Sequence, residues 1–314
     1  MAEAAPLCGT DAAPVPTGAR AEWFAGVGGA RLRAALFPAA SGPRGSVVLS
    51  GGRTEPIEKY FEVVAELAAR GFVVLAHDWR GQGLSQRLLP ERLKGHAAGY
   101  ADFLADYAAL IGTYEAKLPR PWVAVGHSMG GCLTALALAK GERRFAAAAL
   151  SAPMFGIYTN PFPLPVAVAL SAVLRSVGRG GGVPPGVPVS ADPVAFDVNI
   201  LTHDRRRYAR NNDQVAACPD LALGPPTWGW LDFAFRAMGE LKTGSGAPRV
   251  EIPMAVVAAG DDRLVDNRDS RLVTARFPKG RFVEVPGAYH EILQETDDIR
   301  AMFWREFDKL VAGL

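Results

Sequence analysis

The chain has 314 residues, of which 49% are hydrophobic and 21% charged, with a net charge of +2. This composition is that of a globular protein and excludes an intrinsically disordered chain. The nearly neutral balance gives no indication of nucleic acid as a partner. The three cysteines, Cys8, Cys132 and Cys218, are far apart and odd in number. We therefore expect no disulfide framework, no cysteine metal site and a reducing compartment.

The N-terminus is rich in Ala and Pro, and it lacks the basic start and apolar core of a secretory signal. We expect residues 1–19 to form a flexible lead-in. The longest apolar run, 164–174, is shorter than the ~18–20 residues of a membrane span. The chain is thus predicted to be cytoplasmic, at most peripheral to the inner face of the membrane.

From residue 31 onward, predicted strands alternate with predicted helices, which is typical of a mostly parallel sheet flanked by helices. The first strands are expected at residues 31–37, 46–50, 72–77, 122–125 and 145–150. The helices between them are expected at 57–70, 100–114 and 132–140. Near the C-terminus we expect strands at 252–259 and 281–285 and helices at 270–277 and 296–311. The predicted fold class is α/β.

The alternation breaks between residues 153 and 249, where prolines and glycines separate apolar and aromatic patches. We interpret this segment as a lid, inserted into a core of residues 20–152 and 250–314. It would cover the carboxyl edge of the strands, where open α/β sheets place their sites. Its aromatic residues Trp228, Trp230 and Tyr158 are the candidates for contact with an apolar substrate.

The most informative motif is Gly-His-Ser-Met-Gly at 126–130, between a predicted strand and a predicted helix. This is the context of a nucleophile elbow, in which a strained turn exposes the serine hydroxyl. Gly126 and Gly130 remove side chains where strand and helix pack closest. The helix directs its N-terminal N–H groups toward a developing oxyanion. Ser128 is therefore the predicted nucleophile.

A serine nucleophile needs a histidine base, and after an elbow the base follows in the chain. Only His203 and His290 follow Ser128. His290 lies in a loop between the last predicted strand and helix, at the sheet edge beside the elbow. His203 lies in a charged run of the lid and is expected to be solvated. We predict that His290 is the base.

The orienting acid is expected just after the strand at 252–259. The candidates are Asp261, Asp262 and Asp266. Asp262 stands in a turn that leaves the strand, within reach of the histidine. Asp261 could instead cap that turn and Asp266 the next helix. We favour Asp262.

An oxyanion hole needs two backbone donors. One is expected from Met129, directly after the nucleophile, and the other from the loop that follows the strand at 46–50. Arg53 is our choice in that loop, with Gly52 as the alternative.

Two further positions have structural interpretations. Asp78 and Arg80 are predicted to pair and to hold their loop beside the site. His127 is expected to point away from the reacting atoms, because its neighbour Ser128 points toward them.

With these motifs the chain resembles the α/β-hydrolase superfamily, specifically its branch of monoacylglycerol lipases and bacterial lysophospholipases, also grouped with serine aminopeptidase-like hydrolases. The likeness covers residues 20–314 and rests on the segments 52–55, 59–60, 78–85, 126–131, 260–265 and 289–293. It implies Ser128, Asp262 and His290 as the triad, and oxyanion donors at Arg53 and Met129. One departure is Gly51 at the start of the oxyanion loop, where many relatives carry histidine.

The resemblance and the apolar lid imply a carboxylic ester hydrolase that acts on a monoacyl glycerolipid, with no cofactor and no metal. The arginines at 205–207, with Arg210, could meet a phosphate or a membrane, or be a solvated helix face. A small-ester esterase, an aminopeptidase and a non-catalytic binding module are the alternatives. Chain length, head group and oligomeric state stay open.

Overall fold

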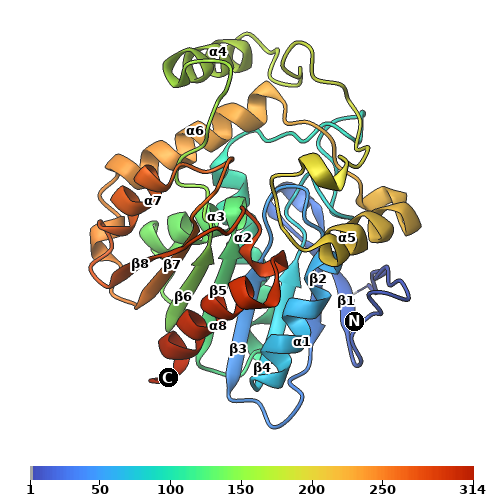
Figure 1. The fold of residues 1–314 in the computed structure, drawn as a ribbon, viewed down its shortest axis with the longest axis vertical. Helices are drawn as coiled ribbons and strands as arrows, with labels where there is room; N and C mark the ends of the chain where they lie inside the picture. Colours follow the sequence, from blue (N-terminus) through green and yellow to red (C-terminus); the bar gives the residue numbers. More distant parts are fainter. Residues whose placement is uncertain (1–2) are drawn as a thin grey trace.

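Eight strands of the described residues, 3–314, form one sheet in the computed structural model (Figure 1). Their order is β1-β2-β4-β3-β5-β6-β7-β8, with β2 antiparallel to both of its neighbours and the other pairs parallel. The bounds are β1 Arg20–Ala25, β2 Arg31–Phe37, β3 Gly45–Ser50, β4 Phe72–His77, β5 Trp122–His127, β6 Ala147–Ser151, β7 Met254–Ala259 and β8 Gly280–Val285. The predicted α/β fold with a mostly parallel sheet is confirmed.

Helices cover both faces of the sheet. Their bounds are α1 Phe61–Ala69, α2 Tyr100–Tyr114, α3 Ser128–Ala139, α4 Leu164–Ser176, α5 Arg205–Ala217, α6 Trp228–Thr243, α7 Asn267–Thr274 and α8 Asp297–Val311. Side chains of α2, α3 and α6 share one apolar cluster with Ala124 of β5, whereas α1 and α8 share the other with Val123. Because the central strands are buried on both faces, they are continuous apolar runs in the sequence.

Most predicted elements are found within a few residues of their expected bounds. The strand β1 was missed, and with it the antiparallel edge of the sheet. Helix α3 begins at Ser128 rather than at residue 132. Its first turn contains Gly130 and Gly131, and because glycine is a poor helix former, the sequence did not predict a helix there.

The inserted segment between β6 and β7 contains α4, α5 and α6. Helix α4 packs on α6 at the top of the view in Figure 1, at the end of the molecule opposite the C-terminus. Helix α6 in turn packs on α3, and its Phe233 is fully buried in the core. The last helix of the insertion is therefore continuous with the core.

The N-terminal segment differs from the flexible lead-in that we expected. Its first two residues lie outside the described part of the chain. Beyond them, the backbone N–H of Ala5 donates to the carbonyl of Ala21, and the N–H of Cys8 to the Glu58 carboxylate. The segment thus lies along β1 and on the core.

The expectation of no disulfide is wrong. Cys8 and Cys218 form a disulfide across 210 positions of sequence, and Cys132 is buried as a free thiol. Cysteine spacing could not reveal this pair, because only the fold brings the N-terminal segment to the end of α5. The argument from cysteines for a reducing compartment therefore loses its basis. Separately, no helix among residues 3–314 is both long and apolar enough to span a bilayer.

Candidate active site

Ser128 stands at the turn from β5 into α3 with a φ of 49°, in the left-handed region that side chains rarely adopt. The glycines around it allow the close approach of strand and helix. A Cβ at Gly130 would lie 2.2 Å from the carbonyl oxygen of Ser50, and one at Gly126 would lie 2.8 Å from Cα of Gly131. Both contacts are with backbone, so the motif needs glycine at each position.

Three side chains from separate strand ends meet at this turn. The Ser128 hydroxyl lies 2.9 Å from Nε2 of His290, and Nδ1 of His290 lies 2.7 Å from Oδ2 of Asp262. The other oxygen of Asp262 accepts the backbone N–H groups of Leu264 and Val265, at 2.8 and 2.9 Å. Asp262 follows β7 and His290 follows β8, so the carboxyl edge of the sheet brings the three together.

The charges around His290 favour its role as a proton acceptor. Burial by itself would lower the pKa of His290, but the adjacent Asp262 carboxylate outweighs burial and the pKa is raised. Burial would raise the pKa of Asp262, but His290 and two backbone N–H donors lower it. Asp262 is therefore ionised at neutral pH and fixes the tautomer of His290 with its proton on Nδ1.

The other acid candidates have local roles. Asp266 caps the N-terminus of α7 by accepting the backbone N–H of Arg268, as the alternative interpretation allowed. Asp261 is exposed and makes no side-chain hydrogen bond within residues 3–314.

The loop after β3 lies against the nucleophile, since a Cβ at Gly52 would come within 3.1 Å of Cβ of Ser128. The backbone N–H of Gly52 is already engaged by the Glu55 carboxylate. The N–H groups of Arg53 and Met129 have no partner within residues 3–314; that of Met129 belongs to the first turn of α3. This arrangement leaves Arg53 and Met129, rather than Gly52, as the free donors beside Ser128.

A buried ionic network under this loop was not found by sequence reasoning. Lys59 lies between two carboxylates, with Nζ 2.9 Å from Glu55 and 2.5 Å from Glu291. Glu55 also accepts the hydroxyl of Tyr60. Burial alone would raise the pKa of Glu55, but Lys59 and His127 lower it to about 2. The signal in the sequence is the i, i+4 pair Glu55 and Lys59; its third member, Glu291, is distant in the chain.

A cavity of about 390 Å³ opens over Ser128 and His290. Its walls are mostly apolar and include Met154, Ile157, Leu201, Pro226, Trp230, Leu231, Leu264 and Val265. Of the three predicted aromatic contacts, Trp230 lines the cavity and Tyr158, half exposed, lies at its mouth. Trp228 does not line it and packs beside Gly182 instead, because residues two apart on a helix face different directions.

A second cavity of about 500 Å³ adjoins the first. The two share Arg53, Thr54, Leu201 and Glu291 in their walls. The second is the more polar, with Tyr208, Asn211 and Asn212 of α5 among its lining residues.

Two further histidines, His127 and His203, differ in their surroundings. His127 is buried, and its Nδ1 lies 3.1 Å from the carbonyl oxygen of Ser151, a structural contact. Burial lowers its pKa to about 4. His203 is exposed, as expected, and in addition its Nδ1 lies 2.7 Å from the buried Glu295 and its ring lies on Tyr289.

The predicted pairing of Asp78 with Arg80 is wrong. Asp78 instead binds the buried guanidinium of Arg33 at 2.7 Å. Arg80 binds Asp106 of α2 at 2.5 Å. Neighbouring residues along this loop point to different sides, so each finds a partner from another element.

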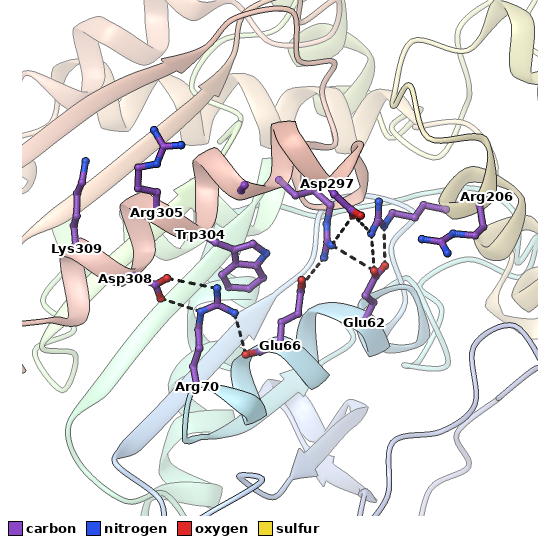
Figure 2. A pocket seen from close by; sticks show the side chains of 12 residues that line it. Glu62, Glu66, Arg70, Arg206, Asp297, Trp304, Arg305, Asp308 and Lys309 are labelled. Carbon is purple, nitrogen blue, oxygen red and sulfur yellow. Dashed lines mark hydrogen bonds and ion pairs between the residues drawn. The ribbon is translucent and has the colours of Figure 1, made fainter.

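The arginine cluster of α5 divides between two environments, seen in Figure 2. Arg207 is buried and binds Glu62, Asp204 and Asp297, which leaves it no capacity for a phosphate. A surface groove of about 830 Å³ lies between α1, α5 and α8, and the exposed Arg206 is at its margin (Figure 2). The cluster thus mainly links α5 to the core elements α1 and α8.

Within residues 3–314, no group of three or more His, Cys, Asp and Glu side chains is arranged to hold a metal ion.

Comparison with known proteins gives a consistent set of relatives. The family model described as serine aminopeptidase, S33, matches residues 41–297. Lysophospholipase L2 of Escherichia coli (strain K12) is 34% identical over 292 residues, which cover 89% of this chain and 83% of that protein. The monoacylglycerol lipase of Mycolicibacterium smegmatis is 30% identical, with 87% of this chain and 91% of that protein covered.

Solved structures share the fold at lower identity. A soluble variant of monoglyceride lipase from Saccharomyces cerevisiae has a TM-score of 0.73 at 17% identity, over 95% of this chain and 97% of that one. The monoacylglycerol lipase of Paleococcus ferrophilus has a TM-score of 0.71 at 22% identity, over 90% and 98%. These likenesses establish the architecture.

Proposed function

This chain belongs to the serine aminopeptidase S33 family of α/β-hydrolases, and from that premise we propose that it hydrolyses the carboxylic esters of monoacyl glycerolipids. The observation that carries the proposal is the continuous hydrogen-bonded chain from Ser128 through His290 to Asp262 under an apolar cavity. The lysophospholipase and monoacylglycerol lipase names of its relatives support the same substrate class.

The reaction proceeds by acyl transfer in two steps. His290 takes the proton of Ser128 as the serine oxygen attacks the ester carbonyl. The N–H groups of Arg53 and Met129 stabilise the oxyanion, at about 3–4 kcal/mol for each well-placed donor. The intermediate expels the alcohol, which takes the proton from His290. Water then gives a proton to His290 and attacks the acyl-enzyme, and the acid leaves as Ser128 is reprotonated.

The apolar cavity supports an acyl chain as the acid part of the ester. Each buried methylene contributes about 0.8 kcal/mol to binding. Trp230, Leu231 and Ile157 offer aliphatic and aromatic surface directly beside Ser128.

An aminopeptidase would need an uncompensated carboxylate for the substrate ammonium. The carboxylates that line the cavity beside Ser128 are Glu55 and Glu291, and both are bound by Lys59. Of the lid acids, Asp197 and Asp204 pair with arginines of α5. These contacts favour the ester over the aminoacyl substrate.

The insertion 153–249 serves in this proposal as a lid that contacts the lipid surface. Exposed apolar side chains gather on α4 and the loop before it: Phe162, Leu164, Val166, Val168 and Val173. Val173 is 56% exposed, and Tyr158 at the cavity mouth is 45% exposed. A lipid substrate would enter from a surface that covers these side chains.

Active-site labelling and a substrate panel test the reaction. A fluorophosphonate is expected to label the wild type and not Ser128→Ala. Turnover is expected to be highest for lysophospholipids and monoacylglycerols, lower for short p-nitrophenyl esters and lowest for aminoacyl anilides. Preference for the anilide would overturn the substrate class, and absence of labelling would favour a non-catalytic scaffold.

Vesicle co-sedimentation tests the contact with lipid. The double variant Val166→Glu/Val173→Glu is expected to lose most of the vesicle-bound fraction. The control Leu314→Glu places one acid on an exposed aliphatic residue at the opposite end of the molecule and should bind as the wild type does. Equal binding of all three proteins would overturn the lid contact.

A further inference from the structure

The side chain of Arg53 lies between the two cavities over the carboxyl edge of the sheet. Its Nη2 donates to the carbonyl oxygen of Gly224, and its guanidinium lies 5.5 Å from the ring centre of Trp230. Nε is shielded from solvent and has no hydrogen-bond partner within residues 3–314. Part of the donor fork is therefore unused at the junction of the cavities.

This guanidinium has no ionic partner in the described chain. The other buried cations beside the site are compensated, Lys59 by Glu55 and Glu291, and Arg207 by three carboxylates including Glu62. Burial lowers the pKa of Arg53 to about 10, and no neighbouring carboxylate offsets that effect. Arg53 is still charged at neutral pH, and a partly buried cation without an anion is unfavourable.

The second cavity has largely apolar walls that also carry a group of polar side chains. Tyr208, Asn211 and Asn212 offer hydrogen-bonding groups around it. Of its two carboxylates, Glu291 is bound by Lys59, and Asp192 is exposed to solvent.

We propose that the second cavity is the head-group subsite of this enzyme and that the Arg53 guanidinium binds the phosphodiester of a lysophospholipid there. The inference rests on the proposed ester hydrolysis, in which the acyl chain occupies the apolar cavity. The alcohol part of the ester then extends past Arg53 into the second cavity, toward Tyr208, Asn211 and Asn212. A guanidinium is suited to phosphate because its planar fork donates two parallel hydrogen bonds.

This assignment makes Arg53 a specificity-determining residue. A monoacylglycerol has the same acyl ester but no phosphate, so it leaves the guanidinium unpaired. The backbone N–H of Arg53 faces the reaction whatever its side chain is, so substitution separates head-group recognition from oxyanion stabilisation.

The test compares kcat/KM for 1-palmitoyl lysophosphatidylglycerol with kcat/KM for 1-palmitoylglycerol. In Arg53→Met the ratio of the two is expected to fall at least tenfold, and in Arg53→Lys by a smaller factor. The control Arg206→Met removes one exposed arginine of the lid outside both cavities and should change the ratio less than twofold. An equal loss on both substrates, or an unchanged ratio, in Arg53→Met would overturn the proposal.

A second variant displaces the guanidinium while keeping its charge. A Cβ at Gly95 would lie 3.0 Å from Nη2 and 3.4 Å from Nε of Arg53. Gly95→Ala is therefore expected to lower the ratio in the same direction. If Arg53→Met does not fold, Gly95→Ala still tests the proposal. An unchanged ratio of the two kcat/KM values in Gly95→Ala would then overturn it.

Inhibition of p-nitrophenyl butyrate hydrolysis separates this inference from the proposed function. Glycerophosphoglycerol is expected to inhibit the wild type at least tenfold more strongly than Arg53→Met, and inorganic phosphate to inhibit more weakly. Inhibition of this kind without lipid hydrolysis would contradict only the proposed function. Equal inhibition of wild type and variant would overturn the Arg53 site, and equal inhibition by inorganic phosphate would overturn its assignment to a head group.

Discussion

At the scale of single residues, the site depends on how charges are compensated. Asp262 orients His290, Lys59 binds two carboxylates, and Arg53 has no carboxylate partner within residues 3–314. Because burial and neighbouring charges shift the pKa of a side chain, these partners determine which of the groups are ionised at neutral pH. Two predictions belong to this scale.

The pH dependence of kcat/KM should report His290. Only the neutral imidazole accepts the serine proton, so kcat/KM falls as pH drops through the pKa of His290. Because Asp262 raises that pKa, the midpoint of the acidic limb is expected above 6.5, the ordinary value. Asp262→Asn should move the limb to lower pH and reduce kcat by about 10⁴-fold. A limb at the same pH in both proteins would contradict the assignment.

Lys59 should be essential for stability. Lys59→Met keeps the length of the side chain but leaves Glu55 and Glu291 without their cation, with an expected loss of about 3–5 kcal/mol in the free energy of unfolding. Lys117→Met, which removes the exposed pair with Glu22, should lose at most about 1 kcal/mol. Urea denaturation of the two variants measures the difference, and equal midpoints would show that the buried network contributes little.

At the scale of elements, the site depends on the close packing of β3, β5 and α3. The strand β5 leads directly into α3, so the nucleophile stands where strand and helix are closest. The glycines of the elbow set that distance, and β3 brings the oxyanion loop to the same place. Backbone contact of this kind does not tolerate an added side chain.

Gly130→Ala should therefore destabilise the protein by about 1–3 kcal/mol or more, since its Cβ would meet the carbonyl oxygens of Ser50 and Gly51. Gly112→Ala is the matched control, because Gly112 lies in α2 and its Cβ would meet nothing within 4 Å. Alanine is the better helix former there and should add about 0.5–1 kcal/mol. Thermal melts compare the two, and a Gly130→Ala protein as stable as the wild type would refute the packing argument.

At the scale of the whole molecule, distant parts of the chain are tied together around the site. The N-terminal segment joins the insertion 153–249 through Cys8 and Cys218, and Arg207 joins the insertion to α1 and to the start of α8. The insertion is thus held to the core by residues far from the reacting atoms.

Loss of the disulfide should lower stability by about 2–4 kcal/mol, because the bond restricts a long loop in the unfolded chain. A reductant is expected to lower the melting temperature of the wild type but not of Cys8→Ser, which should melt like the reduced wild type. Cys132 is buried and present in both proteins, so it does not distinguish them. Identical melting of the wild type with and without reductant would contradict the prediction.

The sequence by itself determined the α/β class, most of the strands and helices, and the nucleophile motif. These features are local: buried strands are continuous apolar runs, and the elbow needs glycines at set positions around Ser128. The order of serine, acid and histidine along the chain also restricted the triad to a few candidates. Of these, Ser128, His290 and Asp262 lie within hydrogen-bonding distance of one another in the structure.

Tertiary structure alone decided the long-range partners of charged and sulfur-containing side chains. Asp78 binds Arg33 rather than Arg80, Cys8 binds Cys218, and Lys59 binds Glu291 across more than 200 residues. Such pairs depend on which side of an element a residue faces and which distant element packs there. Spacing along the chain carries no information about either, so the environment of Arg53 between two cavities could be found only in the folded molecule.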